Sequence, residues 1–334
     1  MHLARKPTSV ELGPIWRDQD WGLLLQPMTQ IKAEEWACAN RDELQALLTE
    51  YGALLFRGFP IESASAFEGF IEQILPSPFV PYREASTPRT RVSGNVFTST
   101  EYPREFDIYL HNENSHVTSW PMYLCFQCRV EPASGGRTPL ANCNRIYDRL
   151  PNYLIKAFSE KGWLYRRNFF DHSAISWKSA FGVSTASELE KYCLENRLTP
   201  EWNELGLSIQ YRRWAVVNHP ELNVPVWFNH GLFFNPFSLA EELREAMAEL
   251  SDDELASCTY FGDGSPVSAA SLAEIDTAYR SEMVSFEWRT SDILILDNMR
   301  IAHGRQAYAG KRDIVVSMKN QVQSQDLPDC QRFL

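Results

Sequence analysis

The chain has 334 residues, of which 44% are hydrophobic and 13% are aromatic, enough to bury a substantial core. Its 32 Lys and Arg residues and 43 Asp and Glu residues give a formal net charge of −11, which disfavours binding to nucleic acid and to anionic membranes. The N-terminus lacks an apolar stretch and no apolar run approaches roughly 18 residues, so we expect a cytoplasmic protein with reduced cysteines.

The first part of the chain alternates helical and extended patterns. Apolar residues at helical spacing predict helices at 42–51 and 65–75, on either side of a buried strand within 52–59. Ser65 has capping-box spacing to the glutamate three residues later, which predicts that the second helix begins there. The region 98–140 is rich in strand formers and turn residues, so we expect several short strands.

A region with more helices follows, and the chain then returns to strands. Thr185 and Ser238 each stand three residues before a glutamate at the start of a helical pattern, which predicts two further helices. The segment 292–318 reads as short strands and turns. The strands before and after the helical region are expected to complete one β core, although they are far apart in the sequence. This pattern predicts a single domain over residues 1–334, with a helical insert at about 145–285.

Cys125 and Cys128 have the CxxC spacing found in zinc and redox sites. A zinc site needs a second pair and a thioredoxin-like site needs a strand-to-helix turn, and neither accompanies these cysteines. On a strand, residues three apart point to opposite faces. We therefore predict a core strand here.

A polar cluster, LHNENSH, occupies residues 110–116. His111 and His116 are about 140° apart on a helix, which argues against a helical zinc-peptidase site. On a strand, His111 and Glu113 project from the same side. A third ligand such as His303, which follows the apolar run ILIL and a turn, would complete the two-histidine, one-carboxylate triad of non-haem iron oxygenases.

A series of motifs in fixed order resembles the TauD/TfdA family of iron(II)- and 2-oxoglutarate-dependent dioxygenases, and within it the SyrP-like branch of peptide-antibiotic pathways. In chain order they are VFTSTEYP, LHNENSH, EPASGGRTPLAN, VWFN, FGDGSP and LDNMRIAHGRQAYAGKR. The resemblance covers roughly residues 52–318. It implies a mainly β fold with a helical insert (α+β), namely a distorted double-stranded β-helix with a jelly-roll-like, cupin-type core.

The same resemblance assigns roles to individual residues. The implied iron(II) ligands are His111, Glu113 and His303. Thr138 is expected to hydrogen-bond the co-substrate, and Arg312 to pair with the distal carboxylate of 2-oxoglutarate through a bidentate contact. Arg305 is a weaker candidate for that pairing, and pairing with an acidic neighbour to hold the loop is an equally good role for it. His230 is expected either to line the pocket or to pack.

The implied activity is hydroxylation of an amino acid, free or bound to a peptidyl carrier protein, in specialised-metabolite biosynthesis such as that of antibiotics. Dioxygen and 2-oxoglutarate are consumed, and succinate and CO2 are released. Related halogenases lack a carboxylate at the position of Glu113, so that chloride can bind the iron there. The presence of Glu113 therefore favours oxygenation over halogenation. The alternatives are a scavenging dioxygenase for sulfonate or aryloxyalkanoate substrates, a desaturase on the same scaffold, and a non-catalytic metal-binding module, against which Arg312 argues.

A basic and aromatic run, YRRNFF, is a candidate docking site for an acidic carrier protein. It contains Arg166, Arg167, Phe169 and Phe170. Ordinary solvated arginines beside a core aromatic pair explain the run equally well.

Overall fold

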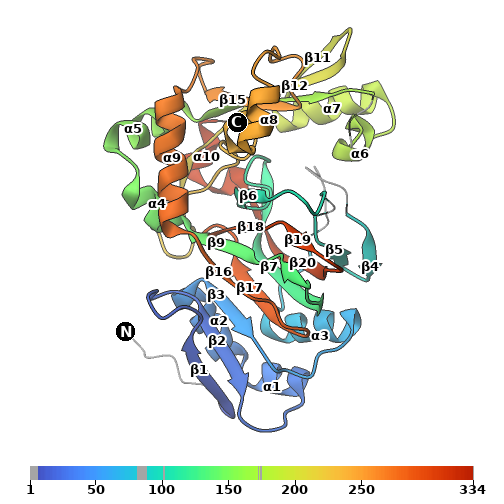
Figure 1. Cartoon of the computed structure of the whole chain (residues 1–334), viewed down its shortest axis with the longest axis vertical. Coiled ribbons are helices and arrows are strands. Elements are labelled where there is room, and N and C mark those ends of the chain that lie inside the picture. Colours follow the sequence, from blue (N-terminus) through green and yellow to red (C-terminus); the bar gives the residue numbers. More distant parts are fainter. Residues whose placement is uncertain (1–6, 81–88, 101, 172, 174, 334) are drawn as a thin grey trace.

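The computed structural model describes residues 7–80, 89–100, 102–171, 173 and 175–333, and two sheets lie at its centre (Figure 1). The larger sheet has eight strands in the order β1–β2–β3–β17–β7–β20–β5–β4. In that order the strands are Val10–Pro14, Leu23–Pro27, Ala53–Phe56, Ile293–Asp297, Ser119–Val130, Asp313–Gln323, Val96–Thr98 and Arg91–Ser93. Strands from both ends of the chain are therefore neighbours in one sheet.

Three helices pack against the outer face of this sheet, at the lower end of Figure 1. They are α1 (Ala33–Ala39), α2 (Arg41–Tyr51) and α3 (Ala64–Ile74). As predicted, α2 ends at Gly52, whose φ of 71° is readily adopted by glycine. The predicted start of α3 at Ser65 is wrong, because the Ser63 hydroxyl accepts a hydrogen bond from the backbone N–H of Ala66 and caps the helix two residues earlier.

The second sheet has four antiparallel strands in the order β16–β9–β18–β6. The strands are Val284–Phe286, Thr138–Asn142, Ile301–Arg305 and Ile108–His111. A buried apolar layer lies between the two sheets, with Leu124 and Leu294 from the larger one and Leu140 and Ile301 from the smaller one. A short ribbon, β8 (Ser134–Gly135) with β19 (Tyr308–Ala309), flanks them. Mainly β structure with helices is therefore observed.

The two CxxC cysteines lie on β7 and are fully buried. Cys125 packs in the apolar cluster beneath helices α1–α3, whereas Cys128 packs in the layer between the two sheets. They point to opposite faces of the strand, so the prediction of a core strand is confirmed.

The segment 145–285 contains strands as well as helices. Its four-stranded antiparallel sheet has the order β11–β12–β10–β15, with bounds Thr199–Asn203, Gly206–Arg213, Trp163–Phe169 and Ser257–Phe261. A ribbon pairs β13 (Val216–Asn218) with β14 (Pro225–Trp227). The helices here are α4 (Cys143–Arg149), α5 (Asn152–Lys161), α6 (Trp177–Phe181), α7 (Ala186–Asn196), α8 (Glu241–Ala246) and α9 (Ala269–Glu282). The expected insert is thus mixed rather than helical alone, since alternating residues on β10 and β12 pack an apolar face.

The two helix starts predicted in this segment have different outcomes. The Thr185 hydroxyl accepts a hydrogen bond from the backbone N–H of Glu188, so the predicted cap of α7 is confirmed. The predicted cap at Ser238 is wrong, because α8 begins at Glu241 after Ala240. Ser238 instead closes a 3-10 turn, η1 (Pro236–Ser238). The chain ends with η2 (Ser324–Asp326) and α10 (Pro328–Gln331).

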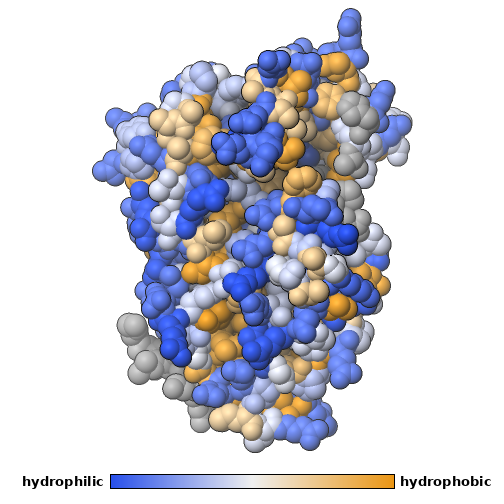
Figure 2. Space-filling view, viewed as in Figure 1, coloured by the Kyte–Doolittle hydropathy of each residue, from blue (hydrophilic) through white to orange (hydrophobic). Residues whose placement is uncertain are grey.

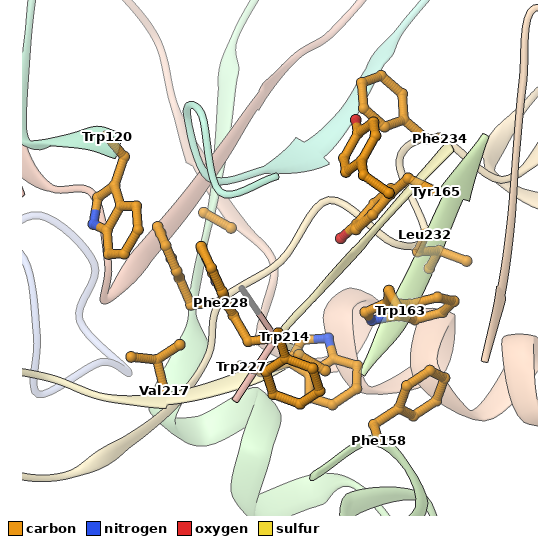
Figure 3. Close-up of a cluster of buried hydrophobic side chains, with 14 of the residues drawn as sticks. Trp120, Phe158, Trp163, Tyr165, Trp214, Val217, Trp227, Phe228, Leu232 and Phe234 are labelled. Atoms are coloured by element: carbon orange, nitrogen blue, oxygen red, sulfur yellow. The ribbon is translucent and has the colours of Figure 1, made fainter. Parts of the chain in front are cut away.

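An aromatic core joins this upper part of the molecule to the central sheets (Figure 3). Trp120 of β7 lies with its ring centroid 5.3 Å from that of Trp214 and 5.1 Å from that of Phe228. Trp227 and Phe228 are fully buried, so their predicted role in the core is confirmed. Because these large rings contact both parts, they fix the position of the segment that lies above β6 and β18.

On the face drawn in Figure 2, hydrophilic and hydrophobic residues are interspersed. Among the described residues, no helix has the length and apolar character needed to cross a bilayer.

Candidate active site

Two histidines from distant parts of the sequence lie side by side on neighbouring strands. His111 ends β6 and His303 lies in β18, and the antiparallel register pairs these two residues directly. Their ring centroids are 4.5 Å apart, and both residues are about 6% exposed. Cross-strand pairs project from the same face of a sheet, so the two imidazoles point toward one position.

Glu113 reaches the same position from a turn rather than from a strand. The expectation that it shares a strand face with His111 is wrong in this detail, because β6 ends at His111 and the chain turns at residues 113–116. The turn includes Asn114 in the left-handed region, with φ of 56°. Asparagine tolerates that conformation better than most residues.

The side chain of Asn298 holds this turn in place. Its Oδ1 accepts a hydrogen bond from the Glu113 backbone N–H at 2.8 Å, and its Nδ2 donates to the carbonyls of Glu113 and Pro121, each at 2.9 Å. Asn298 is fully buried in the turn that precedes His303. One amide therefore fixes the segments that carry Glu113 and His303 relative to each other.

We expect Asn298→Ala to lower the free energy of unfolding by about 2–3 kcal/mol, since it leaves one buried N–H and two buried carbonyls without their partner. Denaturant unfolding measures this loss. Asn298→Asp keeps the acceptor for the Glu113 N–H but sets a buried carboxylate oxygen against two carbonyls, so it is not expected to recover the loss. A loss below about 0.5 kcal/mol for the alanine variant would contradict the role assigned to this amide.

The three side chains form a compact set of potential metal ligands. Ligand atoms of His111, Glu113 and His303 all lie within 4.8 Å of one another, and all three residues are buried. The Nδ1–H of His111 donates to the carbonyl of Tyr109 at 2.9 Å, which leaves Nε2 with its lone pair. Burial lowers the pKa of His111 and holds that of His303 well below its ordinary value, so both rings are neutral at neutral pH.

Arg89 is a site residue that the sequence reasoning missed. Its Nη2 donates to Oε2 of Glu113 at 2.6 Å, and the two side chains are 3% and 4% exposed. No motif marks this arginine, which precedes β4 and lies 24 residues before its partner. The contact depends on tertiary structure, so a local pattern could not have revealed it.

A pocket opens beside the two histidines and contains the residues expected to bind a co-substrate. The described residues that line it are Arg89, Ser99, Thr100, Ile108, His111, Phe126, Thr138, His303, Gly304, Arg305, Arg312 and Ile314. Thr138 is 4% exposed, and its hydroxyl oxygen accepts a hydrogen bond from Nε1 of Trp288 at 2.9 Å. That contact leaves the Thr138 hydroxyl proton available for a ligand, and Trp288 was not anticipated from the sequence.

Arg312 is held in this pocket by the glycine pair that precedes Thr138. Its Nε donates to the carbonyl of Gly136 at 3.0 Å. Gly136 has φ of 63°, and a Cβ at this position would lie 3.0 Å from Cβ of Tyr308 and 3.1 Å from Cδ of Arg312. Burial lowers the pKa of Arg312 to about 10, so the side chain remains a cation at neutral pH. A carboxylate is the ligand that would best satisfy such a buried guanidinium.

Arg305 lines the same pocket but is bound to the backbone. Its two terminal nitrogens donate to the carbonyls of Tyr102, Pro103 and Phe106 at 2.6–2.9 Å. Of the two roles expected for Arg305, holding a loop matches these contacts, although its partners are carbonyls rather than an acid.

Two further histidines, His230 and His116, pack close to His111. Nδ1 of His230 contacts the Ser115 hydroxyl at 2.8 Å, and its ring centroid is 5.3 Å from that of His111. His116 packs against His230, with ring centroids 4.6 Å apart. Burial holds the pKa of both well below the ordinary value. His230 therefore packs against a candidate ligand without being among the residues that line the pocket.

The expected docking run does not form a basic surface patch. Arg167 is 6% exposed and lies over the rings of Phe169 and Phe234, each about 5.1 Å away. Arg166 forms an ion pair with Asp253. Both arginines belong to β10, which lies between β12 and β15, and Arg167 is buried while Arg166 is partly buried.

Comparisons with known proteins agree on one family. The model of the family described as "Taurine catabolism dioxygenase TauD, TfdA family" matches residues 24–318. The dapdiamide synthesis protein DdaC of Enterobacter agglomerans is 32% identical over 293 residues, which cover 86% of this chain and 89% of that protein. A clavaminate synthase-like protein of Arabidopsis thaliana is 30% identical over 286 residues, covering 82% and 83%.

A solved structure resembles the fold over nearly its whole length. PvcB of Pseudomonas aeruginosa has a TM-score of 0.57 at 15% identity, covering 96% of this chain and 94% of that one. A second structure of PvcB, with a TM-score of 0.55, is described as an Fe, alpha-ketoglutarate dependent oxygenase from an isonitrile synthetic pathway. At this identity the likeness concerns the fold.

Proposed function

Because the chain belongs to the TauD/TfdA family and is an iron(II)- and 2-oxoglutarate-dependent dioxygenase, we propose that it hydroxylates an amino-acid-like substrate in specialised metabolism. Dioxygen is the oxidant, and 2-oxoglutarate is converted to succinate and CO2 in the same turnover. The observation that carries this proposal is the buried triad beside a pocket that contains a cationic Arg312.

The residues present fit a resident iron(II) ion. Two neutral imidazoles and one carboxylate, with ligand atoms within 4.8 Å of one another, are the donor set of the facial triad. We therefore assign His111, Glu113 and His303 as the iron ligands. Glu113 supplies the anionic ligand, which favours oxygenation over halogenation.

The pocket fits 2-oxoglutarate in the same way. Arg312 is buried and cationic, and a bidentate pair with the distal carboxylate would satisfy its guanidinium. Thr138, oriented by Trp288, has its hydroxyl proton available for a co-substrate oxygen. We assign these two residues to co-substrate binding, and we assign Arg305 to holding the 102–106 loop.

The protein's part in the reaction is to position the reactants and to exclude water. When bound, iron(II) supplies the electron-transfer chemistry that couples dioxygen to decarboxylation of 2-oxoglutarate and oxidation of the substrate. Arg312 and Thr138 would hold one end of the co-substrate, and His111, Glu113 and His303 would hold the iron(II) ion beside it. Phe126 and Ile314 line the pocket with apolar surface, which limits access of water to the reacting atoms.

The fold assignment extends this proposal. The two facing sheets, with an apolar layer between them, support a distorted double-stranded β-helix with a cupin-type core. We assign residues 1–334 to one domain, with the mixed segment at about 145–285 as its insert. Membership of the SyrP-like branch remains a prediction.

The substrate class rests on the relatives. DdaC is named for dapdiamide synthesis and PvcB for an isonitrile synthetic pathway, which supports a role in specialised metabolism such as antibiotic biosynthesis. Both a free amino acid and one bound to a peptidyl carrier protein are consistent with this role. One alternative is scavenging of sulfonates or aryloxyalkanoates. Another is desaturation, in which the substrate loses two hydrogens instead of gaining an oxygen atom.

Succinate formation tests the proposal directly. The enzyme is incubated with iron(II), 2-oxoglutarate and dioxygen, together with free amino acids, carrier-loaded amino acids, a sulfonate or an aryloxyalkanoate. We expect an amino acid to stimulate succinate formation and to gain one oxygen atom by mass spectrometry. Stimulation by the sulfonate or aryloxyalkanoate alone would favour scavenging, and loss of two hydrogens from the amino acid would favour desaturation.

A further inference from the structure

The guanidinium of Arg312 is held by few contacts within the described chain. Its Nε donates to the carbonyl of Gly136, and no carboxylate among the described residues forms an ion pair with it. Burial and the nearby charge of Arg305 lower the pKa of Arg312 to about 10, so the two arginines repel each other. A long side chain with one backbone contact loses rotamer freedom when it binds a ligand, which weakens binding.

The ring of Tyr308 provides Arg312 with a second contact. Cζ of Arg312 lies 5.6 Å from the centroid of this ring, and Cζ of Arg305 lies 5.2 Å from it. A guanidinium within about 6 Å of an aromatic centroid is attracted by the electrons of the ring. Unlike an aspartate or glutamate, the ring adds no negative charge that would compete with a ligand carboxylate. It can therefore orient Arg312 while leaving the cation available to the ligand.

The ribbon of β8 and β19 fixes Tyr308 relative to Arg312. Tyr308 pairs with Gly135 in the antiparallel register, and its backbone N–H donates to the carbonyl of Arg104 at 2.9 Å. The next residue, Gly136, accepts the hydrogen bond from Arg312. A Cβ at Gly136 would lie 3.0 Å from Cβ of Tyr308 and 3.1 Å from Cδ of Arg312. The glycine thus lets both side chains pack against the same point of the backbone.

We propose that Tyr308 is a positioning residue for 2-oxoglutarate, whose ring orients the Arg312 guanidinium toward the distal carboxylate. Tyr308 is not among the described residues that line the pocket, so it acts through Arg312. The inference rests on the proposed function and adds a residue to its co-substrate site.

The test removes the ring of Tyr308 in two ways and keeps it in a third. Tyr308→Leu and Tyr308→Gln lack the ring, whereas Tyr308→Phe retains it. Phe106→Leu is the matched control, since its partly exposed ring packs on Tyr102. Each protein is loaded with manganese(II), a redox-inert probe, and titrated calorimetrically with 2-oxoglutarate. The same Tyr308 substitutions are also combined with Arg312→Ala.

We expect Tyr308→Leu and Tyr308→Gln to raise the dissociation constant of 2-oxoglutarate about five- to 30-fold. Tyr308→Phe and Phe106→Leu should stay within about twofold of the unaltered enzyme, because the contact with Arg312 is kept. In the Arg312→Ala background, removing the ring should change the dissociation constant less than about twofold, since no guanidinium remains to be oriented. With the iron(II) enzyme, KM for 2-oxoglutarate should rise while kcat for succinate formation is nearly unchanged.

Two results would overturn the proposal. One is an unchanged affinity for 2-oxoglutarate in both variants that lack the ring. The other is an equal fold loss with and without Arg312, which would indicate a general disturbance of the ribbon. Because Tyr308 is partly exposed, both variants are expected to fold, and circular dichroism verifies this. Failure of the proposed function is distinguishable, because the unaltered protein would then bind no 2-oxoglutarate.

Discussion

His111→Ala and His303→Ala variants are expected to lose iron(II) binding, with a dissociation constant raised at least about 100-fold. Each variant leaves two of the three proposed protein ligands. Loss of residues that merely support a ligand costs about 10–100-fold in metal affinity, so loss of a ligand itself should cost more. Metal analysis after anaerobic reconstitution measures the effect, and succinate formation should fall to background.

A matched control separates this loss from general damage to the buried histidine cluster. His116→Phe replaces another buried ring, which packs on His230 but lies outside the ligand set. It is expected to keep a full complement of iron. Near-stoichiometric iron in both the His111 and His303 variants would contradict the assignment of the triad.

Arg312→Ala is expected to raise the dissociation constant of 2-oxoglutarate about ten- to 150-fold. A charge-assisted pair contributes about 1.5–3 kcal/mol, and its loss leaves the distal carboxylate of the co-substrate in a buried pocket without a cation. Arg312→Lys should recover little, since an ammonium group cannot form two parallel bonds to one carboxylate. Calorimetric titration of the manganese(II)-loaded protein gives the dissociation constants.

Arg305→Ala distinguishes the two pocket arginines. Its guanidinium donates hydrogen bonds to the carbonyls of Tyr102, Pro103 and Phe106, so the variant is expected to lose thermal stability. Its dissociation constant for 2-oxoglutarate is expected to stay within a few-fold of that of the unaltered enzyme. If Arg305→Ala weakened 2-oxoglutarate binding more than Arg312→Ala did, the co-substrate contact would have been assigned to the wrong residue.

The sequence predicted that His111, Glu113 and His303 form a metal site, and the structure brings their ligand atoms within 4.8 Å of one another. The turn that carries Glu113 to this place could not be predicted. His111 and Glu113 stand close together in one motif, and the ordered series of motifs extends the pattern to His303. A period-two strand pattern then suggested that His111 and Glu113 share a strand face. The observed turn depends on Asn298, which lies near the other end of the chain and binds both sides of Glu113.

Several residues that sequence reasoning missed or misplaced have roles that depend on long-range contacts. Arg89 pairs with Glu113, and Trp288 orients Thr138, without any local signal. Arg166 and Arg167 looked like surface charges because nothing local indicates that β10 lies inside a sheet. Local patterns succeeded at the glycine after α2 and at Thr185, but capping-box spacing misplaced the helix starts at Ser65 and Ser238.

The pairing of His111 with His303 has a consequence for biosynthesis. β6 leaves the ribosome long before β18 is made, so a nascent chain carries two of the three proposed ligands without the third. Metal binding at the proposed triad therefore follows closure of a long-range strand pair, which is slow to form compared with local helices. An ion bound there then stabilises the completed chain by mass action and favours full-length molecules over C-terminally truncated ones.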